Sequence, residues 1–231
     1  MNPITLFILI VVLLILIYIL YYYFFSTTTY INSSVLNLNT VVVPYTKLAS
    51  PANVRYAFGV WVYVNNLGPN NTILSRPSSS TYATAANNFK LYLDATTPTL
   101  YCYIQNSDAT KTQPTAITNN FPIQRWCFIV VSVDGQFIDY YLNGKLIKSE
   151  KKSTILATPP DGNTPLYLGN TPFLPFDAYL GRVIRWSSPV DPQTAWDTYL
   201  SGNGVSSSVT PYHANLSIMK DHVTTSTYKL W

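Results

Sequence analysis

The 231-residue sequence predicts an all-β domain with one short C-terminal helix, preceded by an apolar N-terminal helix. Three observations predict this fold class. Only 10% of the residues are charged, and the chain beyond residue 25 is rich in Thr, Ser, Asn, Tyr and Pro, which suits a sandwich or barrel with many turns. Several segments alternate their side chains with the period of two of a strand. Two short turns, Asp134-Gly135 and Asn143-Gly144, separate three of these segments.

Residues 4–25 form an apolar run without a charged side chain. As a helix, this run would measure roughly 33 Å, which is close to the apolar thickness of a bilayer. Asn2 is a suitable N-cap, and Pro3 is tolerated at the first helical position. We therefore expect residues 1–25 to be a retained transmembrane anchor that contacts the lipid bilayer through residues 4–25 and gives a single-pass membrane localisation.

A cleaved secretory signal is the alternative interpretation of this run. Signal peptides carry a basic region, a shorter apolar core and small residues at the cleavage site. Here no Lys or Arg precedes the run, and it ends in tyrosines and phenylalanines at residues 21–25. These features favour the retained anchor. The first basic residue, Lys47, lies too far downstream to set the orientation in the membrane.

The β region follows a short polar segment, residues 26–38, which we expect to be a stalk. Pro44 and Pro51 limit the first β segment, at residues 40–43, to an edge or irregular strand. The first strong strand is predicted over residues 56–64, where both faces are apolar or aromatic. We expect such a strand to be central in its sheet and covered on both sides.

A short strand at residues 73–75 and a hairpin of residues 89–94 and 100–105 are predicted next. In the second hairpin strand, three apolar residues alternate with two tyrosines: Leu100, Cys102 and Ile104 with Tyr101 and Tyr103. Residues 126–148 then contain three strand-like runs separated by Asp134-Gly135 and Asn143-Gly144. Type I′ turns need positive φ at both central residues, so these dipeptides predict a three-stranded antiparallel meander.

Two further strands, at residues 166–168 and 179–186, are followed by a predicted short helix. Asp191 is its expected N-cap, Pro192 its first residue and Gly202 its stop. The Ser/Thr-rich tail, residues 205–231, is expected to be either a last strand or an extended arm.

Charge and cysteine content exclude some functions. The formal net charge of +4 is spread along the chain and forms no basic arm, so we expect no nucleic-acid binding. Cys102 and Cys127 are the only cysteines, and they are either paired or two separate buried thiols. Sequons at Asn32, Asn70 and Asn215 would be modified only in a secretory lumen.

Residues 126–149 contain a strand that begins at Trp126, the Asp134-Gly135 turn and the run YLNGKLI at residues 141–147. This succession of features resembles the concanavalin A-like lectin/glucanase superfamily, in its laminin-G and pentraxin-like branch. Other motifs follow the order of the family: FGVWVYV at 58–64, PLYLGN at 165–170, AYLGRVIRW at 178–186 and DPQTAWDTYLSG at 191–202. The resemblance covers about residues 40–202 and implies a jelly roll of two antiparallel sheets, with domain limits at residues 39–204.

The superfamily also contains hydrolases, which need two carboxylates around the glycosidic bond. This sequence has one glutamate, Glu150, so we expect neither an enzyme nor catalytic residues. The calcium site of the pentraxin-like branch needs clustered oxygen ligands, for which Asp94, Asp108 and Asp177 are the candidates. The sequence has no acidic cluster, and its two histidines lie in the polar tail. We therefore expect no metal site and no cofactor.

The aromatic side chains, nineteen Tyr, ten Phe and five Trp, offer material for a binding surface. Aromatic faces stack on sugar rings and anchor protein interfaces. Trp61, Tyr63, Tyr101 and Tyr103 are the candidate glycan or partner contacts, provided that they line the second face of one sheet, where lectins of this superfamily present a groove. The alternative is that they belong to the core between the sheets or to a face that loops cover.

Two functions follow as hypotheses. The anchor, the stalk, the nearly acid-free jelly roll and the Ser/Thr/Asn/Tyr-rich composition are similar to minor capsid proteins of large icosahedral DNA viruses of the chlorella-virus type. That resemblance implies a non-enzymatic structural protein of the virion, which links an internal membrane to the capsid shell through the major capsid protein. The alternative is a membrane-anchored lectin that binds glycans for surface attachment.

Overall fold

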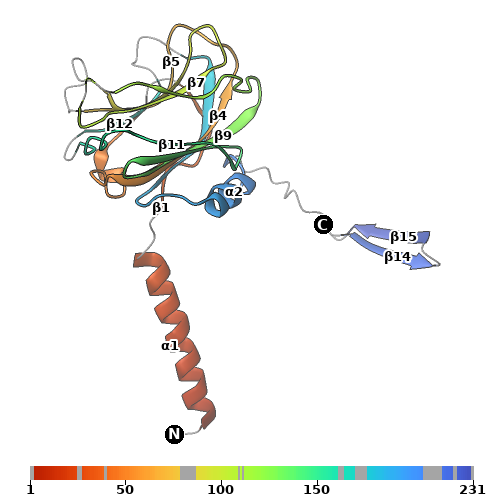
Figure 1. The fold of residues 1–231 in the computed structure, drawn as a ribbon. Helices are drawn as coiled ribbons and strands as arrows, with labels where there is room; N and C mark the ends of the chain where they lie inside the picture. The colour runs from red at the N-terminus through yellow and green to blue at the C-terminus, as the bar shows by residue number, and fades with distance from the viewer. Residues whose placement is uncertain are drawn as a thin grey trace.

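Two antiparallel β-sheets packed face to face make up most of the structure, with a short helix on the outer face of one sheet (Figure 1). The predicted all-β sandwich with one short C-terminal helix is thereby confirmed. The computed structural model describes residues 3–24, 28–38, 41–78, 87–108, 110, 112–160, 164–169, 176–204, 215–220 and 223–229.

The larger sheet, sheet A, has seven strands. Its order is β1-β13-β4-β9-β10-β11, and β2 also pairs with β13. The strands are β1 (Thr28–Asn32), β2 (Leu36–Asn37), β4 (Arg55–Val64), β9 (Trp126–Asp134), β10 (Phe137–Leu142), β11 (Lys145–Lys151) and β13 (Ala178–Trp186).

The second sheet, sheet B, has six strands in the order β3-β12-β5-β6-β7-β8. The strands are β3 (Val41–Val43), β5 (Asn71–Pro77), β6 (Asn87–Leu93), β7 (Leu100–Ile104), β8 (Thr115–Thr118) and β12 (Leu166–Leu168). A 3₁₀ helix, η1 (Tyr45–Lys47), follows β3. The predicted edge position of the segment before Pro44 is confirmed, because β3 is the first strand of sheet B.

The predicted meander is formed by β9, β10 and β11, which pair in succession. Asn143 and Gly144 have φ of 51° and 76°, as the predicted type I′ turn requires. The other turn is shifted by one residue: Asp134 pairs with Phe137 as part of β9. Its central residues are therefore Gly135 and Gln136, and only Gly135 has a positive φ, 63°. Glycine at the first central position is the pattern of a type II′ turn.

The main core lies between the two sheets and is built from alternate residues of their strands. From β4 it takes Tyr56, Phe58, Val60, Val62 and Val64, and from β7 Leu100, Cys102 and Ile104. Cys102 and Cys127 are free thiols that are both buried in this core, so the alternative of two separate thiols is the one that the structure shows.

The segment before β3 belongs to sheet A. The sequence predicts a stalk over residues 26–38, whereas β1 pairs with β13 and β2 pairs with β13 further along. Leu38 is buried in the core, and its N–H donates a hydrogen bond to the carbonyl oxygen of Ala178. The pairing partner lies about 150 residues away in the sequence, so no local pattern indicates it.

Two buried arginines fasten the chain before β4 to the sandwich. The guanidinium of Arg185 donates hydrogen bonds to the carbonyl oxygens of Ala49 (2.8 Å) and Ser50 (3.0 Å). Arg76 donates in the same way to the carbonyl oxygen of Pro51 (2.5 Å). Burial lowers the pKa of Arg185 to about 10, because a charged guanidinium loses its hydration inside the protein.

A polar cluster joins the sheets at one side, where β8 and β11 are the last strands. The carboxylate of Glu150 accepts hydrogen bonds from the hydroxyls of Thr115 (2.7 Å) and Tyr140 (2.8 Å). Lys152 Nζ lies 2.8 Å from the same carboxylate oxygen. Burial raises the pKa of Glu150, but the hydrogen bonds from Lys152, Thr115 and Tyr140 outweigh it, so the pKa lies below its ordinary value. The single glutamate is a structural link between the sheets.

The N-terminal helix, α1, extends from Pro3 to Phe24. Among the residues that the structure describes, no helix is long and apolar enough to cross a membrane. This finding contradicts the predicted localisation as a single-pass membrane protein of a virion.

The C-terminal tail contains a separate two-stranded sheet, in which β14 (Asn215–Lys220) pairs with β15 (Val223–Lys229). The sequence leaves open whether the tail is a last strand or an extended arm. In the structure its two strands pair with each other and with neither of the two large sheets, over the residues described there.

Candidate functional site

The predicted aromatic contact Trp61 is covered by a helix. Trp61 lies on β4, is 6% exposed, and its ring stacks on Phe128 of β9 with 5.2 Å between the centroids. The Trp61 ring also stacks on Tyr199 of helix α2 (Pro192–Leu200), with 5.4 Å between the two centroids. Trp61 therefore belongs to a second hydrophobic cluster, between the outer face of sheet A and α2, and is not open to a ligand.

The other three predicted aromatics do not join Trp61 in one groove. Tyr63 lies half-buried on the same face of sheet A, 5.7 Å from the ring of Trp126. Tyr101 and Tyr103 lie on β7 of sheet B, where their alternation with core residues turns them to the outer face. The structure thus divides the four residues between the outer faces of two sheets. Period-two alternation identifies the outward residues of a strand but not the sheet to which the strand belongs.

The N-cap and the apolar face of helix α2 account for its position on sheet A. Asp191 caps it by accepting a hydrogen bond from the N–H of Thr194 (2.8 Å), and Pro192 occupies the first turn, both as predicted. Ala195 is fully buried against the sheet, and Tyr199 packs on the same cluster. The side chain of Ala195 is small enough for the helix to lie close to the strands.

The chain that leads into α2 is tied to the sheet by Ser132. The Ser132 hydroxyl accepts a hydrogen bond from the N–H of Val190 (2.9 Å) and donates one to its carbonyl oxygen (3.1 Å). The hydroxyl of Tyr141 also donates to that oxygen (3.4 Å). Burial raises the pKa of Tyr141 to about 12, so its hydroxyl keeps its proton at neutral pH.

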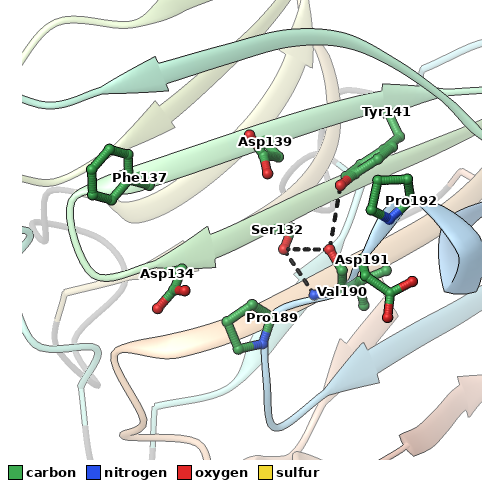
Figure 2. A pocket seen from close by; sticks show the side chains of 9 residues that line it. All are labelled: Ser132, Asp134, Phe137, Asp139, Tyr141, Pro189, Val190, Asp191 and Pro192. Atoms are coloured by element: carbon green, nitrogen blue, oxygen red, sulfur yellow. Dashed lines mark hydrogen bonds between the residues drawn. The ribbon is translucent and has the colours of Figure 1, made fainter.

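A pocket of about 360 Å³ opens between this segment and strands β9 and β10 (Figure 2). We call it the Asp139 pocket. Its lining combines carboxylates, aromatic rings and prolines: Ser132, Asp134, Phe137, Asp139, Tyr141, Pro189, Val190, Asp191 and Pro192. Phe137, Asp139 and Tyr141 alternate along β10, so all three lie on the outer face of sheet A.

The three carboxylates of the pocket differ in their partners. Asp134 forms an ion pair with Arg55, with 2.7 Å between Oδ1 and Nε. Asp191 caps α2, and the N–H of Thr194 is the main cause that lowers its pKa. The carboxylate of Asp139 accepts no hydrogen bond and forms no ion pair with any residue that the structure describes. It is half-buried between two aromatic side chains of its own strand.

This arrangement is suited to binding rather than to covalent chemistry. The Ser132 hydroxyl is buried and fully engaged by Val190, so it is not available as a nucleophile. Carboxylate oxygens accept hydrogen bonds from hydroxyl groups, and an exposed aromatic ring packs on the apolar face of a ligand. Phe137 is 55% exposed, and Lys151 Nζ lies 5.4 Å from the centre of its ring.

The acidic residues considered as metal ligands lie apart. Asp94 and Asp108 accept hydrogen bonds within their own turns, and Asp177 accepts them from Asn65 and Asn66. Among the described residues, no group of three or more His, Cys, Asp or Glu side chains could hold a metal ion. The two histidines lie outside the residues that the structure describes.

Sequence reasoning missed the Asp139 pocket. Its one local signal is the alternation of Phe137, Asp139 and Tyr141, which places a carboxylate between two outward aromatic side chains. The other wall, Pro189 to Pro192, reaches the pocket only because α2 folds back onto sheet A. The same fold-back removes Trp61 from the surface.

Comparisons of the chain with protein-family models and with solved structures both agree with the observed fold. A family model described as the concanavalin A-like lectin/glucanases superfamily matches residues 37–195. Domain 4 of the extracellular arabinanase of Geobacillus stearothermophilus, solved with arabinotriose, has a TM-score of 0.54 at 16% identity, over 74% of this chain and 86% of that one. The CBM40 of the Ruminococcus gnavus IT-sialidase, bound to α2,3-sialyllactose, has a TM-score of 0.57 at 11% identity, over 72% of this chain and 96% of that one.

A third similar structure belongs to a longer protein. Trypanosoma rangeli sialidase has a TM-score of 0.52 at 16% identity, over 72% of this chain but only 27% of its own. This chain therefore corresponds to about a quarter of that sialidase. No curated protein sequence matches the chain.

Proposed function

The chain belongs to the concanavalin A-like lectin/glucanases superfamily, and from this premise we propose that it is a non-enzymatic carbohydrate-binding protein. The ligand class is a neutral, hydroxyl-rich sugar held in the Asp139 pocket. The fold hosts lectins and hydrolases alike, so the choice between them depends on the residues of the site.

One observation carries the proposal: Asp139 is a carboxylate without a partner among the described residues, inside a pocket lined by rings. The Asp139 carboxylate lines the open pocket, so a ligand that enters it meets acceptor oxygens that no donor of the described residues occupies. A sugar supplies the missing donors, because two neighbouring hydroxyl groups can each donate to one of its oxygens. Such charge-assisted hydrogen bonds are short and strong.

The remaining lining selects a neutral ligand. Asp134 and Asp191 line the same pocket as Asp139, and their negative charges disfavour any ligand that carries a negative charge. Pro189 and Pro192, together with the exposed ring of Phe137, offer apolar surface to the C–H face of a sugar ring. Apolar walls with a few polar groups that fix orientation are typical of small-molecule sites.

The partners and pKa values of the carboxylates in this chain argue against catalysis. Glycoside hydrolysis needs one carboxylic acid with a raised pKa and one free carboxylate. Asp191 has a lowered pKa and caps a helix, and Asp134 is paired with Arg55. Glu150, the only glutamate, is committed to the polar cluster between β8 and β11.

The test is isothermal titration of the full chain with a panel of neutral oligosaccharides. At least one should bind with saturable heat, and Asp139→Asn should weaken it by roughly 10- to 100-fold, because hydrogen bonds to a charged group contribute about 1.5–3 kcal/mol. Asp197→Asn is the matched control, since Asp197 is an exposed carboxylate on α2 outside the pocket. It should leave the affinity unchanged.

Two results would contradict the proposal: equal weakening by the two variants, or no binding to any neutral sugar. New reducing ends released from a bound oligosaccharide would contradict its non-enzymatic part. The role of a minor capsid protein that contacts the major capsid protein stays a prediction from overall composition.

A further inference from the structure

We propose that a second pocket on the same face of sheet A, beside the second half of α2, binds an acidic sugar. Its volume is about 340 Å³, and its lining consists of Arg125, Leu142, Asn143, Lys145, Trp196 and Tyr199. We call it the Arg125 pocket. The sugar part of this inference rests on the carbohydrate-binding role proposed above, whereas the anion contact depends on this pocket alone.

The charge of the Arg125 pocket is opposite to that of the Asp139 pocket. Arg125 and Lys145 are both exposed cations, and none of the described residues that line the pocket is acidic. Neither cation lies within ion-pair distance of a described carboxylate. Two cations at the rim of one concavity attract an anionic group, and arginine offers paired N–H donors that match a carboxylate or a sulfate.

The two cations extend from fixed points of the backbone. Arg125 follows Gln124, which has a φ of 58° and whose N–H donates a hydrogen bond to the carbonyl oxygen of Val64 (2.7 Å). Lys145 follows the Asn143-Gly144 turn, where Asn143 Oδ1 accepts a hydrogen bond from the N–H of Phe128 (2.9 Å). The backbone beside each cation is therefore held to sheet A by a hydrogen bond.

Trp196 and Tyr199, the aromatic wall of the pocket, pack closely against the Asn143-Gly144 turn. Gly144 lies directly under α2: a Cβ atom at this position would be 2.8 Å from Cε3 of Trp196 and 3.1 Å from Cβ of Tyr199. The rings of Trp196 and Tyr199 have centroids 5.6 Å apart, and Tyr199 is backed by the buried Trp61. Trp196 is 37% exposed, so part of the ring is open to a ligand.

The combination of rings and cations points to a sugar that carries the anion. An inorganic phosphate or sulfate needs only the cations and gains nothing from an aromatic wall. A sugar ring stacks its C–H face on an indole, while its carboxylate or sulfate reaches the cations. The Asp139 pocket repels such a ligand, so the two pockets select different sugars.

The experiment compares an acidic and a neutral probe on the full chain. The probes are a glucuronic acid-containing disaccharide, its sulfated counterpart and the equivalent neutral disaccharide, titrated at low and at moderate salt. Each acidic probe should bind at least tenfold more tightly than the neutral one, and added salt should weaken only the acidic probes. Arg125→Gln and Lys145→Gln should each reduce their affinity by about tenfold or more.

Asp139→Asn serves as the control that separates the two pockets. It should leave the binding of the acidic probes unchanged. Loss of acidic-probe binding in Asp139→Asn but not in Arg125→Gln would overturn this inference, and it would also contradict the neutral selectivity proposed for the Asp139 pocket. If no neutral sugar bound, while the binding of the acidic probes still depended on Arg125, the first proposal would be overturned and this one would remain. Inorganic sulfate that binds as tightly as the sulfated disaccharide would overturn the sugar assignment.

Discussion

Trp61 of β4 and Tyr199 of α2 stack with their ring planes 18° apart and their centroids 5.4 Å apart. This contact decides which part of sheet A is covered and which part is open. The helix closes over Trp61 and leaves a pocket near each end of β10. The tryptophan that the sequence offers as a sugar contact is thus the residue that positions the helix.

Trp61→Ala should therefore destabilise the protein. Removal of a buried tryptophan leaves a cavity, and we expect the free energy of unfolding to fall by about 3–5 kcal/mol. Denaturant unfolding followed by circular dichroism measures this loss. Trp196→Ala is the matched control, because Trp196 is 37% exposed, and it should cost far less. A Trp61→Ala variant with unchanged stability but lost sugar binding would show that Trp61 contacts the ligand after all.

Ser132→Ala should loosen the segment that forms one wall of the Asp139 pocket. The substitution leaves the buried N–H of Val190 without its acceptor, at a cost of about 1–3 kcal/mol. Amide hydrogen exchange should become faster at Val190 and Asp191, which carry the amide hydrogens of this segment, and affinity for a neutral sugar should fall. Ser149→Ala is the control, since Ser149 is exposed on β11. Equal rates of amide exchange in this segment of the two variants would contradict the assigned role of Ser132.

Gly144→Ala should be more damaging than Gly135→Ala, although both glycines have positive φ. At Gly135 an added Cβ meets nothing within 4 Å, so the cost is the backbone strain alone, about 1–2 kcal/mol. At Gly144 the added Cβ also collides with Trp196 and Tyr199, so α2 must shift. Thermal unfolding of the two variants measures the difference. An equal loss of stability in the two variants would mean that α2 moves aside without cost.

Glu150→Gln should remove part of the acid sensitivity of the fold. The pKa of Glu150 is lower in the folded chain than its ordinary value of about 4.3, so the ionised carboxylate stabilises the native state. That contribution is present above the ordinary pKa and is lost as the pH falls through the lowered folded pKa. We expect the stability of Glu150→Gln to be about 1–3 kcal/mol lower at pH 7 and to change less below pH ~4.

Urea unfolding of both proteins between pH 7 and pH ~2.5 checks this prediction. Asp197→Asn removes a carboxylate that is exposed on α2, and it should unfold like the parent protein across the range. If the difference between Glu150→Gln and the parent protein were constant over the whole range, the carboxylate would contribute through shape and not through its charge.

The sequence predicts the parts of this fold that depend on neighbouring residues. Asn143-Gly144 specifies its turn because positive φ is a local requirement, and Asp191-Pro192 begins α2 for a similar reason. The other hairpin was displaced by one residue because Gly135 and not Asp134 takes the positive φ. Strands β1 and β2 escaped prediction because they form only by pairing with β13.

The candidate sites depend on contacts that no local pattern reveals. Tyr101 and Tyr103 share a periodicity with Trp61 and Tyr63, but strand order places the two pairs on different sheets. The Asp139 and Arg125 pockets both require α2 to lie on sheet A, a contact between residues far apart in the sequence. A carboxylate between two outward aromatic side chains becomes a pocket only after that contact is made.

The place of β13 in sheet A has a consequence for the way the chain acquires its structure. β13 lies between β1 and β4, and so separates two strands that are synthesised more than a hundred residues earlier. Until residue 186 has left the ribosome, β1 has no partner and one side of β4 is unpaired. We expect the sheet to close late, by long-range pairing, and folding to be slow for a domain of this size. A chain that ends before β13 would expose the long, apolar edge of β4, which is a template for aggregation.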